Sequence, residues 1–357
     1  MNLIRLIPAE GDYGPINARP RSPGAARDSF CFNPDSCCFF RFRRFQGNEN
    51  IVVVYTYDSF VSDWGAGPLI AKGFEQATGI KVKFVSKGDG GQLLSSLILE
   101  KGKSEADVAL GIDSFLAAKA LKSGLFSSYV SPALKSIPKD LRFDSSCRLL
   151  PYDWGYFAIV WDSAKLANPP KSLEDLTRPE YAKKLILMDP RTSTPGLGFL
   201  AWTEAVYGAG WKDYWRRLRP SVLTMTPGWD QGYGLFTSGE APLVLSYALD
   251  TAYNLHEEKS DRLRSLAFTE GGMKQIECAG ILAGAKHRAA AEKFIDYLLG
   301  AGQAELPLTQ WMYPANSSTK LPDCYSAVAL PAKTLTVDTS HIADDAVAAA
   351  EILSSAK

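Results

Sequence analysis

After residue 50, apolar runs typical of strands alternate with stretches of helical spacing. Residues 51–55 form a continuous apolar run, which is typical of a strand covered on both faces in a parallel sheet. Residues 69–77 follow with helical spacing and end before Gly79. The order continues with strands predicted at residues 80–85 and 106–110 and helices predicted at residues 92–100 and 115–121. Parallel strands joined by helices are the stable arrangement of this β-α-β-α-β-α order.

A second α/β unit begins near Pro151. Its pattern predicts strands at residues 157–161, 186–188, 222–226 and 243–245, a further apolar stretch at 277–284, and helices at 197–206 and 289–299. A chain of 357 residues also exceeds what one hydrophobic core usually spans. We therefore predict an α/β protein of two lobes with a cleft between them. Residues 51–150 start the first lobe, 151–274 form the second, and 275–357 return to the first with C-terminal helices.

Residues 1–50 differ from the rest of the chain. All seven basic residues of this segment are Arg, and five prolines interrupt it, so we predict a disordered segment or atypical leader without a clear export signal. The segment holds Cys31, Cys37 and Cys38, half of the cysteines. The other three, Cys147, Cys278 and Cys324, lack the spacing of a zinc ribbon or thioredoxin motif and are predicted to be buried thiols. A Cys147–Cys278 disulfide stays open as an alternative.

Charge and hydropathy exclude several classes of partner. The formal net charge is zero and the sequence pI is about 6.8, which argues against nucleic acid or an anionic membrane as the main partner. No run of eighteen apolar residues occurs, so no membrane-spanning helix is predicted.

Short polar and aromatic segments mark the points where predicted strands give way to helices. They are Tyr57-Asp58-Ser59-Phe60 with Trp64, Gly88-Asp89-Gly90-Gly91, Gly111-Ile112-Asp113, residues 189–196, Gly228-Trp229 and Ser246-Tyr247. Ligands of α/β proteins bind beyond the carboxyl ends of strands. The pattern therefore predicts that side chains from distant parts of the chain converge on one small-molecule site.

Two of these segments have both a structural and a functional interpretation. At the helix start after Pro190, Ser193 or Thr194 suits the N-cap, but the free N–H groups of a helix N-terminus also suit an anion or a hydroxyl. Gly88-Asp89-Gly90-Gly91 is either a tight turn or a loop whose backbone approaches a ligand closely. It does not match a dinucleotide-binding or P-loop pattern.

Four aromatic residues lie in loop-like contexts instead of on apolar helix faces: Trp64, Trp229, Trp311 and Tyr247. Half-buried packing explains each of them taken alone. Together with the acidic residues Asp58, Asp89, Asp113 and Asp250, they predict a crevice that stacks on a ligand and neutralises a cation. The implied ligand is flat and positively charged.

The usual residues of catalysis are scarce. The chain has only three histidines, His256, His287 and His341, and neither a G-x-S-x-G nor an H-E-x-x-H motif. Paired carboxylates stay open as a catalytic alternative. We predict a binding protein with no catalytic and no metal-ligating residues.

Several ordered motifs resemble those of a known family. They are residues 54–60, Asp63-Trp64-Gly65, residues 151–158, residues 189–198 (DPRTSTPGLG), Gly228-Trp229 and Trp311-Met312-Tyr313-Pro314. Over about residues 51–335, the chain resembles the thiamine-binding members of the type II periplasmic binding proteins, which serve bacterial ABC importers. The resemblance implies two mixed sheets flanked by helices, with crossover hinge strands, in two lobes that close on the ligand.

The resemblance also implies a ligand and its site. Thiamine has a cationic thiazolium and a flat aminopyrimidine, and its phosphate esters add an anion. The implied ligand-binding residues are Asp58, Trp64, Asp89, Gly90, Ser193, Thr194, Trp229, Tyr247, Ala248, Leu249, Asp250 and Trp311. We expect Trp229 or Tyr247 to stack on a ring and the acidic residues to hold the cation or the amino group. Ser193 and Thr194 are expected at the hydroxyethyl or phosphate end.

The expected biology follows from the same resemblance. The protein is expected to be a periplasmic monomer that delivers thiamine to a membrane permease, with thiamine as cargo and no cofactor. Ala248-Leu249-Asp250 differs from the small hydroxylated residues usual in this turn of the family. The added carboxylate of Asp250 would strengthen the binding of a cation but repel a phosphate ester. Two alternatives stay open: a binding protein for another organic cation such as a polyamine, and a thiaminase-like enzyme with a cysteine nucleophile.

Overall fold

The computed structural model describes residues 50–354. The leader predicted at residues 1–50, with Cys31, Cys37 and Cys38, lies outside the described residues apart from Asn50. The strands are β1 (Ile51–Thr56), β2 (Lys81–Ser86), β3 (Val108–Asp113), β4 (Phe126–Ser127), β5 (Leu150–Asp162), β6 (Leu185–Met188), β7 (Val222–Thr226), β8 (Leu243–Tyr247), β9 (Leu263–Leu266), β10 (Gly272–Leu282), β11 (Tyr313–Pro314) and β12 (Thr334–Leu335). The α-helices are α1 (Asp58–Val61), α2 (Gly67–Thr78), α3 (Gly90–Leu99), α4 (Ala117–Lys122), α5 (Thr194–Tyr207), α6 (Trp211–Leu218), α7 (Trp229–Ser238), α8 (Asp250–His256), α9 (Arg288–Leu299) and α10 (Ile342–Ser354).

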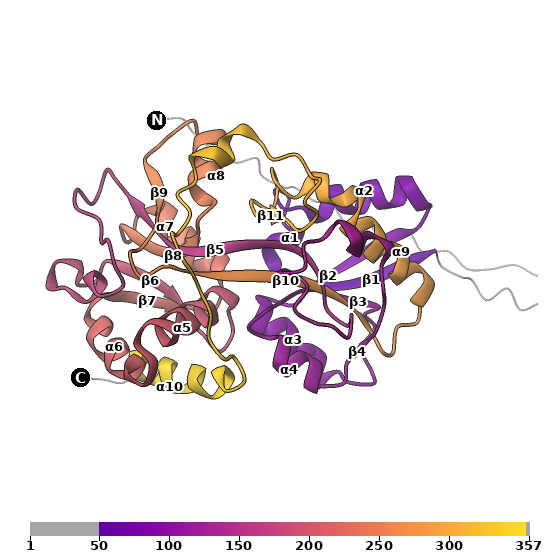
Figure 1. Ribbon diagram of the computed structural model, residues 1–357, viewed down its shortest axis with the longest axis horizontal. Helices are drawn as coiled ribbons and strands as arrows, with labels where there is room; N and C mark the ends of the chain where they lie inside the picture. The colour runs from indigo at the N-terminus through magenta and orange to yellow at the C-terminus, as the bar shows by residue number, and fades with distance from the viewer. Residues whose placement is uncertain (1–49, 355–357) are drawn as a thin grey trace, which may run out of the picture. The chain divides into compact units, whose positions relative to one another are not determined.

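Two long strands, β5 and β10, run side by side and connect two regions of mixed sheet (Figure 1). The strand order is β2-β1-β3-β10-β5-β8-β6-β7. Strand β1 pairs in parallel with β2 and β3, and β6 pairs in parallel with β7 and β8. Strand β10 runs antiparallel to β3 and β5, while the second half of β5 pairs with β8 and β9. The predicted mixed sheets with crossover strands are confirmed.

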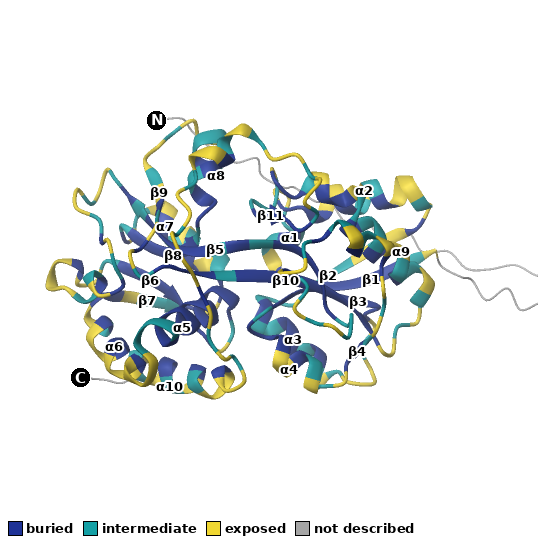
Figure 2. Cartoon of the chain, viewed as in Figure 1, coloured by how far each residue is buried: buried dark blue, intermediate teal, exposed yellow. Residues whose placement is uncertain are grey.

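Burial explains why the hydrophobic pattern predicts these elements. Val52 and Val54 in β1 are fully buried, and β1 has a paired strand on either side. Helix α2 has Pro68 in its first turn and is capped by Gly79, whose N–H donates to the carbonyl of Glu75 and whose positive φ of 70° turns the chain out of the helix. Figure 2 shows β1, β3, β5 and β10 buried along most of their length, with exposed residues on the outer faces of the helices.

Five helices have no predicted range: α1, α6, α7, α8 and α10. The same holds for the short strands β4, β9, β11 and β12 and for the first halves of β5 and β10. Helix α10 packs against α5 and α6, which lie in the segment assigned to the second lobe. The expectation that residues 275–357 return as a whole to the first lobe is therefore not met at α10. The other lobe boundaries stay a prediction.

Cys147, Cys278 and Cys324 are free thiols, so the alternative of a Cys147–Cys278 disulfide is not realised. Of these three, only Cys278 is fully buried, since Cys147 and Cys324 are partly exposed.

Among the helices of residues 50–354, none is long and apolar enough to cross a membrane.

Candidate functional site: an acidic cavity at the strand ends

A cavity of about 690 Å³ lies where the carboxyl ends of several strands meet. Asp58 and Asp89 come from the segments after β1 and β2, and Trp229 and Asp250 come from those after β7 and β8. Thr194, the first residue of α5, also lines the cavity. The volume is within the range of about 300–1,000 Å³ that is typical of small-molecule sites. The polar segments therefore converge as their positions at the strand ends predict.

The carboxylate of Asp89 joins the N-termini of three helices. Its Oδ1 accepts hydrogen bonds from the N–H of Gly90 at 2.6 Å and the N–H of Thr194 at 3.2 Å. Its Oδ2 accepts from the Ser193 hydroxyl at 2.8 Å and the N–H of Trp229 at 3.0 Å. The donors stand at the starts of α3, α5 and α7. Because a carboxylate has about four acceptor positions, protein donors already fill those of Asp89.

Helix dipoles explain why a carboxylate suits this position. Burial raises the pKa of Asp89, and the hydrogen bonds from Ser193 and from three backbone N–H groups oppose that effect. The close approach of α3 and α5 requires glycine, since a Cβ added at Gly90 would lie 2.3 Å from Oγ1 of Thr194. The anion site predicted at the start of α5 is thus occupied by the side chain of Asp89.

A second buried carboxylate, Asp113, holds Thr194 in place. Its Oδ2 accepts a hydrogen bond from the Thr194 hydroxyl at 2.6 Å, and its Oδ1 accepts from the N–H groups of Phe115 and Leu116 at 2.6 and 3.0 Å. Burial raises the pKa of Asp113 to about 6, although these hydrogen bonds lower it. Asp113 does not itself line the cavity. It therefore positions Thr194 instead of facing a ligand.

Aromatic rings line another part of the cavity. Trp229 stacks on Tyr233, one helical turn later in α7, with ring centroids 4.7 Å apart and planes at 22°. The indole N–H of Trp229 donates to the Ser246 hydroxyl at 2.9 Å, which fixes the ring. Trp64 meets Trp229 edge to face at 6.3 Å and is 57% exposed. Such rings suit a flat cationic ligand.

Carboxylates dominate the polar lining. The acidic lining residues are Asp58, Asp89, Asp230, Asp250, Glu257, Glu258 and Glu277, and among the described residues that line the cavity none is Lys, Arg or His. Asp250 is 7% exposed, and its Oδ2 has no hydrogen-bond partner among residues 50–354. Burial raises the pKa of Asp250 to about 7, although hydrogen bonding from the Ser246 side chain and the Tyr247 backbone lowers it. Burial, together with the charges of Asp58 and Asp89, raises the pKa of Asp230 to about 6. A bound cation would stabilise both carboxylates in the ionised form.

Glu277 connects the cavity with a buried polar network on β5 and β10. Its Oε2 accepts hydrogen bonds from the hydroxyls of Tyr57 and Tyr152 at 2.9 and 2.7 Å, and its Oε1 accepts from the side-chain amide of Gln275 at 2.7 Å. Burial raises the pKa of Glu277, and burial beside Glu277 raises the pKa of Asp153 well above its usual range. The two carboxyl groups therefore favour a single shared negative charge.

Comparison with known proteins assigns the chain to a family. Residues 103–331 match the family described as bacterial extracellular solute-binding protein. The chain belongs to this family. The thiamine-binding periplasmic protein of Brucella abortus is 44% identical over 295 residues, which cover 82% of this chain and 87% of that protein. The thiamine-binding periplasmic protein of Escherichia coli is 41% identical over 295 residues, covering 82% and 89%. A solved structure titled periplasmic thiamin binding protein has a TM-score of 0.79 at 38% identity and covers 85% of this chain and 95% of that chain.

This solute-binding protein has the two-lobed α/β type II fold that the motif resemblance implies. The expectation of a binding protein instead of an enzyme agrees with the family, whose matched relatives are named as binding proteins. Its cavity offers carboxylates and aromatic rings, which is the chemistry that recognises an organic cation.

Most of the predicted ligand-binding residues of this solute-binding protein line the cavity: Asp58, Trp64, Asp89, Gly90, Thr194, Trp229, Tyr247, Asp250 and Trp311. Ser193, Ala248 and Leu249 do not line it. Ser193 donates its hydroxyl to Asp89. Ala248 and Leu249 are 3% and 1% exposed, because the turn from β8 into α8 buries them, and Leu249 packs with Tyr313. Contact of the lining residues with a ligand stays a prediction.

Several lining residues of the solute-binding protein were not predicted. Tyr233 lies four residues after Trp229, so helical spacing would have placed it on the same face of α7. Asp230 directly follows Trp229, and this position in the sequence could have identified it. No pattern indicates Glu277, because it lies in a stretch interpreted only as apolar.

Proposed function

We propose that this solute-binding protein captures thiamine in the acidic cavity and delivers it to the membrane permease of an ABC importer. The observation that carries the proposal is the buried carboxylate of Asp250. Its Oδ2 has no hydrogen-bond partner among the described residues, and no basic side chain of residues 50–354 shares the cavity. An organic cation would complete this site. The names of the relatives at 41–44% identity support thiamine as that cation.

The geometry supports a division of roles within the cavity. Asp250 and the half-buried Asp230 offer carboxylates to the thiazolium or to the amino group of the pyrimidine. The ring of Trp229 stacks on Tyr233 and donates its indole N–H to Ser246, and it offers a face on which a ring of the ligand can stack. We propose that thiamine is cargo, that no cofactor takes part, and that the protein works as a monomer in the periplasm, the compartment in the names of its relatives.

The residues at the start of α5 indicate whether thiamine or its phosphate ester binds more tightly. The N–H of Thr194 already donates to Asp89, so a phosphate group would have to displace a carboxylate to gain that donor. Asp250 adds a like charge. We therefore expect thiamine to bind at least as tightly as thiamine monophosphate. Replacing Asp250 with Ser should shift the ratio of the two affinities toward the monophosphate, and an unchanged ratio would mean that Asp250 lies away from the anionic end.

Calorimetry on the purified full chain tests the proposed function. Thiamine is expected to bind at one site per chain, and spermidine at equal concentration is expected to compete poorly. Mass spectrometry of the same sample after incubation should recover intact thiamine. Tighter binding of spermidine would favour the polyamine alternative, and release of free pyrimidine would favour the thiaminase-like alternative. Absence of thiamine binding to the folded protein would reject the proposal.

A further inference from the structure

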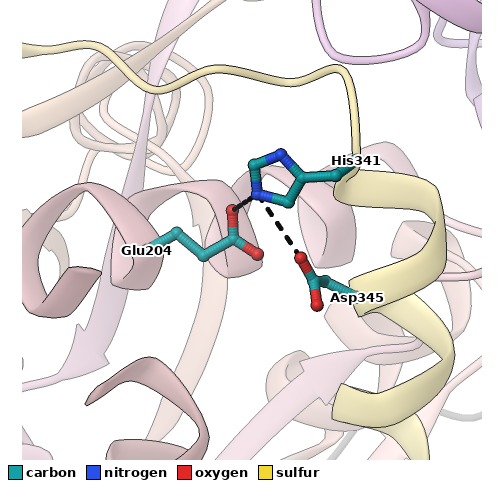
Figure 3. Close-up of side chains that lie close together, drawn as sticks. All are labelled: Glu204, His341 and Asp345. Carbon is teal, nitrogen blue, oxygen red and sulfur yellow. Dashed lines mark ion pairs between the residues drawn. The ribbon is translucent and has the colours of Figure 1, made fainter. Parts of the chain in front are cut away.

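Three ionisable side chains meet away from the cavity, where α10 packs against α5 (Figure 3). Glu204 lies in α5, His341 directly precedes α10, and Asp345 lies in the first turn of α10. Nε2 of His341 is 3.6 Å from Oε2 of Glu204 and 3.4 Å from Oδ2 of Asp345. None of the three residues lines the cavity described above.

Glu204 has a buried carboxylate that lacks a hydrogen-bond partner. The residue is 6% exposed, and neither Oε1 nor Oε2 has a hydrogen-bond partner among residues 50–354. Burial and the charge of Asp345 raise the pKa of Glu204 to about 7, and His341 opposes both effects. Buried carboxylates normally accept hydrogen bonds, whereas Glu204 has, among the described residues, only its ion pair with the half-exposed His341, so its oxygens are available to a further cation.

The spacing of the three donors suits a small divalent transition-metal ion. Zinc binds imidazole nitrogen and carboxylate oxygen at about 2.0–2.2 Å, so neighbouring donors of a tetrahedral site lie about 3.3–3.6 Å apart. The two separations measured from Nε2 of His341 are 3.4 and 3.6 Å, and one donor atom from each residue lies within 4.8 Å of the others. The side chain of His341 is 52% exposed, which leaves the site open to ions from solvent and to a water ligand.

We propose that Glu204, His341 and Asp345 bind one divalent transition-metal ion, with Zn²⁺ the best fit, and that this ion fastens α10 to α5. Imidazole nitrogen and carboxylate oxygen are both ligand types of Zn²⁺, and a water molecule can take the fourth position of its tetrahedral shell. His341 and Asp345 lie just before and within the first turn of α10, and Glu204 lies in α5, so the ion links segments more than one hundred residues apart. The site does not depend on the ligand proposed for the cavity.

A Zn²⁺ titration of the full chain tests the site. The protein is stripped with a chelator and its cysteines are alkylated, so that thiolates do not compete for the metal. Competition with a chromogenic chelator then gives the affinity. The wild type is expected to bind one Zn²⁺ that His341→Ala and Asp345→Asn weaken at least about tenfold. Asp344→Asn removes an exposed carboxylate from the same helix and is expected to stay within about twofold of the wild type.

Thermal melting gives a second readout. Zn²⁺ is expected to raise the melting temperature of the wild type and of Asp344→Asn, and to leave that of Glu204→Gln and His341→Ala unchanged, because only a bound ion stabilises the native state. Glutamine keeps the shape of Glu204 but removes its charge. Equal Zn²⁺ affinity in the wild type and His341→Ala, or a Zn²⁺-induced rise that persists in Glu204→Gln, would overturn the proposal.

Discussion

Replacing Asp250 with Asn should weaken thiamine binding and stabilise the ligand-free protein at the same time. The pKa of Asp250 is raised from 3.8 to about 7 by burial. Because the folded-state pKa is above the unfolded one, the ionised carboxylate destabilises the folded protein above pH 7, and this effect is lost as the pH falls toward 4. At about 1.4 kcal/mol per pKa unit, the destabilisation reaches roughly 4 kcal/mol at pH 8.

Asparagine removes this charge but leaves an amide group in the same buried position. An unpaired amide costs about 1–3 kcal/mol, so the net gain is roughly 1–3 kcal/mol. For a protein of this size, that gain raises the melting temperature by about 2–5 °C. Binding should change in the opposite direction. Removing one partner of a buried charge pair costs about 2 kcal/mol or more, which corresponds to a roughly 30-fold weaker affinity for thiamine.

Scanning calorimetry of the ligand-free proteins and titration calorimetry with thiamine, both at pH 8, measure the two effects. Glu257→Gln is the matched control, because Glu257 also lines the cavity, directly after α8, but is exposed. Because solvent screens an exposed charge, the melting temperature and the thiamine affinity of this control should both stay close to those of the wild type. The reasoning fails if Asp250→Asn melts below the wild type, or if it binds thiamine as tightly as Glu257→Gln does.

Three further predictions test other parts of the cavity. Asp89→Ala leaves the starts of three helices without their acceptor and should lower stability by about 3–5 kcal/mol, seen in urea unfolding; an unchanged midpoint would contradict the hydrogen bonds described. Trp229→Ala should weaken thiamine binding by about 1–3 kcal/mol in calorimetry, whereas Trp229→Phe should retain most of the affinity, and equal losses would exclude stacking. The affinity of the wild type for thiamine should rise between pH 5 and pH 8, because Asp230 and Asp250 ionise near pH 6 and 7 and create the charges that attract the cation. A pH profile of affinity that is flat, or that Asp250→Asn leaves unaltered, would contradict this assignment.

The sequence predicts the parts of the fold in which burial follows a simple pattern. Strand β1 is buried on both faces, and its sequence is a nearly unbroken apolar run. The first half of β5 is also buried, but it interleaves Tyr152 with Asp153 and Gly155, so neither alternation nor an apolar run marks it. The C-terminal helices were predicted without a range for α10, because the inward face of α10 consists largely of alanine, for example Ala346 and Ala349, which signals burial weakly.

The site was predicted where chemistry and position coincide along the chain. Trp229 and Asp250 lie shortly after strands, at the starts of the next helices, and were predicted from that position. The role of Asp89 could not be found in this way, because its donors Ser193 and Trp229 lie 104 and 140 residues away. A carboxylate that accepts hydrogen bonds from helix starts and one that faces a ligand look alike in sequence. Only the fold distinguishes Asp89 from Asp250.

The convergence of three helix starts on Asp89 has a consequence for protein engineering. The lining of the cavity divides into a part that the fold requires, around Asp89 and Thr194, and a part that the fold tolerates at an energetic cost, around Asp230 and Asp250. Libraries aimed at new organic cations should therefore randomise the second part together with Tyr233 and leave the first part unchanged. Biosensors built in this way would change their selectivity while keeping the scaffold that positions the cavity.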